Sequence, residues 1–86
     1  MSLREKLLDG IIDGKLGTGI IVTRQELINA FPEEPQTYSG VFLSNSEMET
    51  GHHSPTYDHF TIRVSRGRYR IHPQALIDRM RERRLI

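Results

Sequence analysis

The chain contains no cysteine and no tryptophan, and its aromatic residues are three tyrosines and three phenylalanines. The absence of cysteine excludes disulfides, thiolate catalysis and cysteine-based zinc sites. No apolar run approaches the roughly 18–20 residues that span a bilayer, and the N-terminus lacks the apolar stretch of a signal peptide. We therefore expect a cytoplasmic protein without membrane contact. Its 86 residues are too few to divide between two cores, so we expect a single domain over residues 1–86.

Positive charge is absent from the middle of the chain and concentrated at its C-terminal end. There is no lysine or arginine between residues 25 and 62. The last 26 residues carry eight arginines against two acids, whereas the first 60 carry four basic residues against nine acidic ones. This division is hidden in a net charge of +1, and it indicates an anionic partner for the C-terminal part.

Local signals mark where helices begin. Ser2 with Glu5, and Thr23 with Glu26, have the form of capping boxes, and Pro73 suits the first residue of a helix. The spacing of apolar residues predicts helices over residues 3–13, from residue 24, over 38–48 and over 73–84. The segment 38–48 has the weakest signal because it is rich in serine and asparagine.

Residues 60–71 alternate apolar and polar side chains on both sides of Arg66-Gly67, which predicts a β-hairpin with a tight turn. Pairing Ser65 with Arg68 would bury one face and turn the arginines to solvent. The buried face would consist of Phe60, Ile62, Val64, Tyr69 and Ile71. Arg63 would then oppose Arg70, at a cost of up to about 1 kcal/mol. An anionic partner would offset this cost; alternatively, the charges keep an edge hairpin soluble.

The order helix, short strand, helix, turn, helix, hairpin predicts an α+β fold of the winged helix-turn-helix class. In this interpretation three helices are followed by a hairpin wing and a C-terminal helix. The helix-turn-helix covers about 24–48, the wing 60–71 and the last helix 73–84.

Two segments resemble a prokaryotic winged-helix domain that is found fused to, or encoded beside, restriction endonucleases. Thr56–Phe60 contains a Tyr-Asp pair after a histidine-containing loop, and Arg63–Ile71 has the form R-V-x-R-G-x-Y-R-hydrophobic. The resemblance implies DNA binding in restriction, phage defence or regulation. This chain departs from the family because its third helix carries no lysine or arginine, and Glu47 and Glu49 close that segment.

We therefore expect a nucleic-acid-binding module that contacts duplex DNA. The expected DNA-binding residues are Thr37, Ser39, Ser44, Asn45, His52, His53, Arg63, Arg66, Arg68 and Arg70. We expect no enzyme activity, catalytic residue, metal, cofactor or small-molecule substrate. The alternative is a protein–protein interaction or self-association module that uses an acidic helix-turn-helix face and a basic wing. Its partner would be another protein, or a second copy of the chain in a homo-oligomer.

Two further clusters leave alternatives open. A zinc site could form from four histidines and Asp58; the histidines are His52, His53, His59 and His72. Adjacent histidines in a loop rarely reach one ion, so a polar loop without metal is favoured. The arginines at the end of the last helix either complement its dipole or contact phosphate. These are Arg79, Arg81, Arg83 and Arg84.

Overall fold

Four helices surround one antiparallel sheet of three strands in the computed structural model, which describes residues 1–86. The elements are α1 (Leu3–Ile12), β1 (Ile21–Thr23), α2 (Arg24–Ala30), α3 (Gln36–Asn45), β2 (Thr61–Ser65), β3 (Arg68–Ile71) and α4 (Pro73–Glu82). The strand order is β1-β3-β2, so β3 lies in the centre of the sheet and pairs with both neighbours. The expected α+β class is confirmed at this level.

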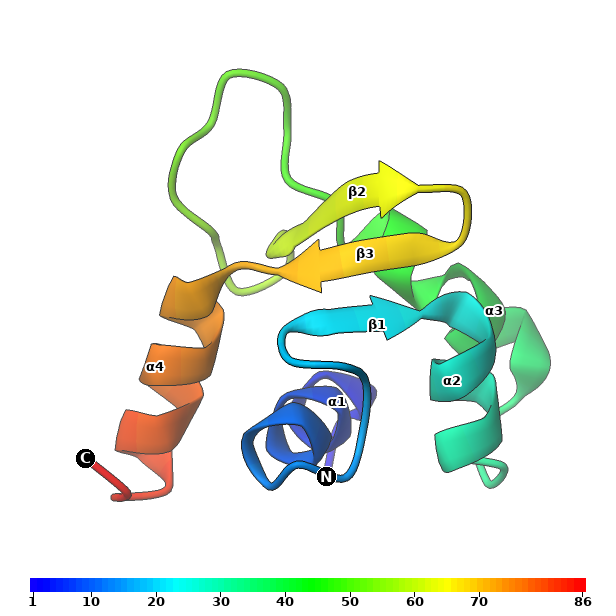
Figure 1. The fold of residues 1–86 in the computed structure, drawn as a ribbon, viewed down its shortest axis with the longest axis horizontal. Helices are drawn as coiled ribbons and strands as arrows, with labels where there is room; N and C mark the ends of the chain where they lie inside the picture. The colour runs from blue at the N-terminus through cyan, green and yellow to red at the C-terminus, as the bar shows by residue number, and fades with distance from the viewer.

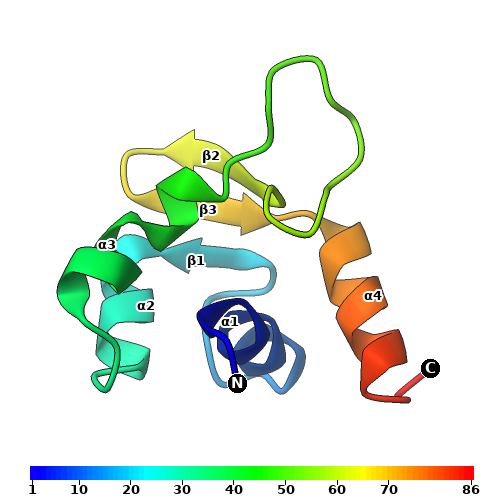
Figure 2. The ribbon, with the colours of Figure 1, turned by 180° about the vertical axis from the view of Figure 1, so that it is seen from behind.

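Figure 1 shows α1 beneath the sheet, with α4 at one end of the molecule and the α2–α3 pair at the other. The core lies between α1 and the sheet, where Leu7, Leu8, Val22 and Ile71 are fully buried. In Figure 2, seen from behind, the turn of the β2–β3 hairpin again lies at the α3 end, far from α4. The sheet therefore carries its hairpin turn toward α3.

Three of the four predicted helix starts are confirmed, at residues 3, 24 and 73. Ser2 and Thr23 accept hydrogen bonds from the backbone amides of Glu5 and Glu26, whose carboxylates accept from the Ser2 and Thr23 amides in return. These reciprocal bonds satisfy amides that a helix N-terminus otherwise leaves without partners. Pro73 begins α4, as its fixed φ angle favours.

Helix α3 begins and ends earlier than the predicted range of 38–48. It runs over residues 36–45 because Ser46 is drawn into the sheet edge: its carbonyl accepts the backbone amides of Phe60 at 2.8 Å and Thr61 at 3.0 Å. Glu47 and Glu49 therefore lie beyond the helix, so the prediction that they close it is wrong.

The hairpin lies where it was predicted, but its register is wrong beyond the first pair. Ser65 faces Arg68 as expected, whereas Arg63 rather than Val64 faces Tyr69. Val64 is the extra residue of a β-bulge, and its side chain is 45% exposed instead of buried. A bulge shifts the pairing of every preceding residue in the strand by one position relative to the partner strand. Side chains expected on one face of the sheet then lie on the other.

The bulge places Thr61 opposite Ile71 on the inner face, with an exposed fraction of 0%. The buried Thr61 hydroxyl donates to the Leu43 carbonyl at 2.8 Å, so α3 and β2 are joined by a satisfied polar contact. Ile62, which is half-buried, lies opposite Arg70.

The predicted opposition of two like charges across the hairpin is therefore absent. Arg63 pairs with Tyr69 and Arg70 pairs with Ile62. The argument that repulsion between these arginines requires an anionic partner is wrong. Tyr69 and Ile71 are buried and Arg63 and Arg70 are exposed, as predicted.

Candidate functional site

The four arginines of the hairpin are exposed and unpaired. Every ion pair of the molecule involves other residues, and none of the four guanidinium groups donates a hydrogen bond within the protein. We call them the hairpin arginines: Arg63, Arg66, Arg68 and Arg70. Their positive charge is available to a ligand along the hairpin, with Arg66 in the turn and the other three arginines on the two strands.

Helix α3 offers an uncharged surface at the same end of the molecule (Figures 1 and 2). Thr37, Ser44 and Asn45 are exposed, as a binding role requires. Ser39 is only 1% exposed, and its hydroxyl donates to the Pro35 carbonyl at 3.3 Å. Ser39 therefore has no access to a ligand, and its prediction as a site residue is wrong.

Two apolar side chains of α3 also face solvent, which the sequence analysis did not expect. Tyr38 is 45% exposed and Val41 is 43% exposed. The helix buries Ser39 and Leu43 instead, four residues apart on its inner face. Tyr38 and Val41 lie three residues apart and therefore share the outer face.

The acidic turn before α3 is partly neutralised within the molecule, by one lysine that pairs with two glutamates. The Lys6 ammonium lies 2.7 Å from a carboxylate oxygen of Glu33 and 3.0 Å from one of Glu34. The hydrogen bond from Lys6 lowers the pKa of Glu33, and the same bond raises the pKa of Lys6. The α2–α3 pair is therefore less acidic than its sequence indicates.

The first and last helices are joined by a network of ion pairs. The Arg79 side chain is nearly buried and binds both carboxylate oxygens of Asp9, from Nε at 2.8 Å and from Nη2 at 3.0 Å. The hydrogen bond from Arg79 lowers the pKa of Asp9 and raises that of Arg79 itself. We call this network the α1–α4 clasp; it consists of Glu5, Asp9, Asp13, Arg79, Glu82 and Arg83.

The clasp gives two of the C-terminal arginines a role that neither alternative described. Arg79 and Arg83 bind carboxylates of α1, Arg83 at 3.1 Å from Asp13. Both are structural, and neither is free to contact phosphate. Arg81 and Arg84 remain exposed, but α4 lies at the end of the molecule opposite α3 (Figure 1).

The histidine-containing loop lies apart from the surface formed by α3 and the hairpin turn. His52 and His53 are exposed, and the loop that carries them rises beside the start of β2, away from the turn (Figures 1 and 2). No three His, Asp or Glu side chains gather closely enough to hold a metal ion. His72 instead caps α4, where its Nδ1 accepts the Gln74 amide at 3.0 Å.

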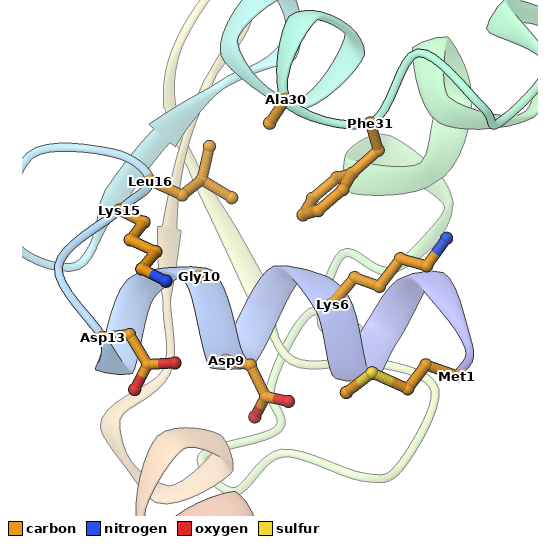
Figure 3. A pocket seen from close by; sticks show the side chains of 9 residues that line it. All are labelled: Met1, Lys6, Asp9, Gly10, Asp13, Lys15, Leu16, Ala30 and Phe31. Carbon is orange, nitrogen blue, oxygen red and sulfur yellow. The ribbon is translucent and has the colours of Figure 1, made fainter.

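A cleft of about 420 Å³ separates α1 from the end of α2. In Figure 3, Leu16 and Phe31 face α1 across this cleft, and Lys6 lies at one end. Lys6 is bound to glutamates and Asp9 to Arg79. Asp13 is bound to Arg83, so among the charged residues that line the cleft only Lys15 forms no ion pair.

Comparison of the chain with protein-family models, with curated protein sequences and with solved structures gives no match. None of the four helices combines the length and the apolar composition that crossing a membrane would require.

Proposed function

We propose that this protein is a winged-helix module that binds duplex DNA. The order α1, β1, α2, α3, β2, β3, with β1 paired to the second strand of the hairpin, is compatible with that fold. In this proposal α3 is the recognition helix and the β2–β3 hairpin is the wing. The C-terminal helix braces α1 from the far side and takes no part in binding.

The four unpaired hairpin arginines, beside an uncharged α3, are the observation that carries this proposal. Arginine side chains of a protein release counterions from DNA when they neutralise its phosphates, and this release supplies most of the non-specific affinity for DNA. The pairing of Glu33 and Glu34 with Lys6 reduces the negative charge of the turn before α3 from two to one, which weakens the electrostatic repulsion between α3 and DNA.

Helix α3 would enter the major groove while the hairpin arginines bind the backbone or the adjacent minor groove. Asn45, Ser44 and Thr37 are exposed and can hydrogen-bond base edges or phosphates. Val41 is suited to contact the methyl group of thymine. The similarity of the hairpin motif to restriction-associated domains supports a setting in restriction, phage defence or regulation.

Replacing two hairpin arginines tests the proposal. Four to six phosphate contacts would give a log–log dependence of affinity on salt with a slope of about −4 to −5. The double variant Arg66→Ala/Arg68→Ala should flatten this slope by about two, because two contacts are lost. Fluorescence anisotropy with a random-sequence duplex measures it.

The matched control is Arg81→Ala/Arg84→Ala, which removes the same charge from the opposite end of the molecule. We expect this control to keep the slope of the unmodified protein. Equal flattening by both double variants would show that net charge alone governs binding, and the absence of duplex binding at low salt would refute the proposal.

Self-association is the second candidate function, favoured by the exposed Tyr38 and Val41 on α3. An apolar helix face beside free arginines could bind another protein molecule. Sedimentation at low and high salt, with and without a random-sequence duplex, separates the candidates: a salt-sensitive oligomer that ignores DNA would favour association.

A further inference from the structure

A second basic feature lies where α3 meets the hairpin turn. A cleft of about 410 Å³ opens there, and we call it the hairpin cleft. Its lining residues are Arg24, Gly40, Leu43, Ser44, Arg66, Gly67 and Tyr69. Two arginines from different elements, α2 and the turn, thus reach one cleft that contains no acidic residue.

Arg24 is held in place at two points. Its backbone amide donates to the Gly67 carbonyl at 2.8 Å, and its side-chain Nε donates to the Gly40 carbonyl at 2.7 Å. Arg24 forms no ion pair, and both of its Nη groups lack hydrogen-bond acceptors within the protein. The guanidinium is therefore oriented by the protein, while its charge and four of its five N–H groups stay available.

Gly40 allows Arg24 to take this position. A Cβ atom on Gly40 would lie 2.7 Å from Nη2 of Arg24 and 3.3 Å from its Cζ, so any side chain at this position would displace the Arg24 guanidinium. Gly40 lies inside α3 and has no positive φ angle, so the helix backbone does not require glycine here. Glycine is the least favourable residue in a helix interior after proline, and here it leaves room for the Arg24 guanidinium beside the helix backbone.

We propose that the hairpin cleft binds one phosphate group of the DNA backbone through Arg24, which the protein holds in place, and Arg66, which is exposed and unpaired. This inference rests on the proposed function. It adds a DNA contact that lies between the recognition helix and the wing. Arginine binds phosphate through two parallel N–H donors, and the free Nη groups of Arg24 provide them. The phosphate fixes the register of α3 in the groove.

Two substitutions test the cleft by different routes. Arg24→Ala removes the charge and should weaken duplex binding about tenfold at 0.1 M salt, while the salt slope flattens by about one. Gly40→Ala keeps every charge but displaces the guanidinium. It should weaken binding several-fold without lowering the melting temperature, because alanine favours the helix.

Arg24→Lys and Arg81→Ala are the controls. Arg24→Lys keeps the charge without the planar fork, so it should retain the salt slope but lose affinity. Arg81→Ala removes one charge from the far end of the molecule and should leave both quantities unchanged. Inorganic phosphate, at ionic strength matched with chloride, should displace no more duplex than chloride does.

The possible outcomes separate this inference from the proposed function. Normal binding and slope in both Arg24→Ala and Gly40→Ala, with weakened binding in Arg66→Ala/Arg68→Ala, would overturn the cleft inference and leave DNA binding intact. Specific displacement by inorganic phosphate would show that the cleft takes a small phosphate compound instead, and would also overturn it. A protein that binds no duplex at all would refute both proposals.

Discussion

The hairpin and the α1–α4 clasp both depend on arginine, but only the clasp supplies its guanidinium groups with carboxylates. Arg79 contacts Asp9, Glu5 and Glu82. The hairpin arginines contact no acid. The density of arginine in a sequence therefore measures surface charge poorly, because the fold decides which guanidinium groups are neutralised. Four predictions test this contrast.

The largest effect should follow from removing the centre of the clasp. Arg79→Ala leaves Asp9 without its bidentate partner, and loss of one member of a nearly buried pair costs about 3 kcal/mol. Urea denaturation should show this decrease in the free energy of unfolding. The exposed Arg81→Ala variant should change it by less than about 0.5 kcal/mol, and equal effects would show that the clasp does not stabilise the fold.

Acid should weaken the clasp as well. Arg79 lowers the pKa of Asp9 in the folded state below the ordinary value. The ion pair therefore contributes its full stability above the unfolded aspartate pKa of about 4. That contribution is lost as the pH falls through the lower folded pKa. The stability of Asp9→Asn, measured by urea denaturation from about pH 5 to pH 3, should fall less steeply than that of the unmodified protein. Parallel curves would contradict the prediction.

A carboxylate introduced opposite a hairpin arginine should neutralise its guanidinium group, as the carboxylates of the α1–α4 clasp neutralise Arg79. Ser65 lies directly opposite Arg68, and both side chains are exposed. Ser65→Glu should stabilise the hairpin by a few tenths of a kcal/mol through a cross-strand pair. It should also weaken duplex binding about tenfold at 0.1 M salt, since Arg68 is no longer free. Ser65→Gln is the uncharged control for anisotropy, and equal losses in both variants would argue against a role for charge.

The smallest effect concerns the uncharged face of α3. If Val41 contacts a thymine methyl group, replacing thymine by uracil in the duplex should weaken binding by about 0.8 kcal/mol, or roughly fourfold. Val41→Ala should bind both duplexes alike. Competition between the two duplexes measures the ratio, and a preference that persists in Val41→Ala would exclude this residue as its source.

Local signals made much of the fold predictable from the sequence. The capping boxes, Pro73 and the Arg66-Gly67 turn act over a few residues, and each feature lies where its pattern indicates. The bulge at Val64 was not predictable, because strict alternation is the only register signal in the strand. The shifted register is accompanied by a hydrogen bond from Thr61 to the Leu43 carbonyl, between residues 18 positions apart.

The candidate site was predictable only in part for the same reason. The hairpin arginines follow from their alternation with apolar residues. The commitment of Arg79 to Asp9, 70 positions away, leaves no trace in a local pattern. Arg24 is a lone arginine in the sequence, and its role depends on the missing side chain of Gly40 and on the hairpin turn.

The uneven distribution of arginines with and without carboxylate partners also affects how the molecule orients in an electric field. Arg24 and the hairpin arginines carry five positive charges, while the whole chain has a net charge of +1, so the remaining residues carry an excess of four negative charges. The five guanidinium groups that have no carboxylate partner lie on α2 and the β2–β3 hairpin of a body that measures 31 × 30 × 21 Å. Near a polyanion, within the screening length of about 8 Å at physiological salt, the field would rotate the molecule before contact. A nearly neutral protein would then arrive hairpin first, and its association rate would depend on salt far more steeply than its net charge implies.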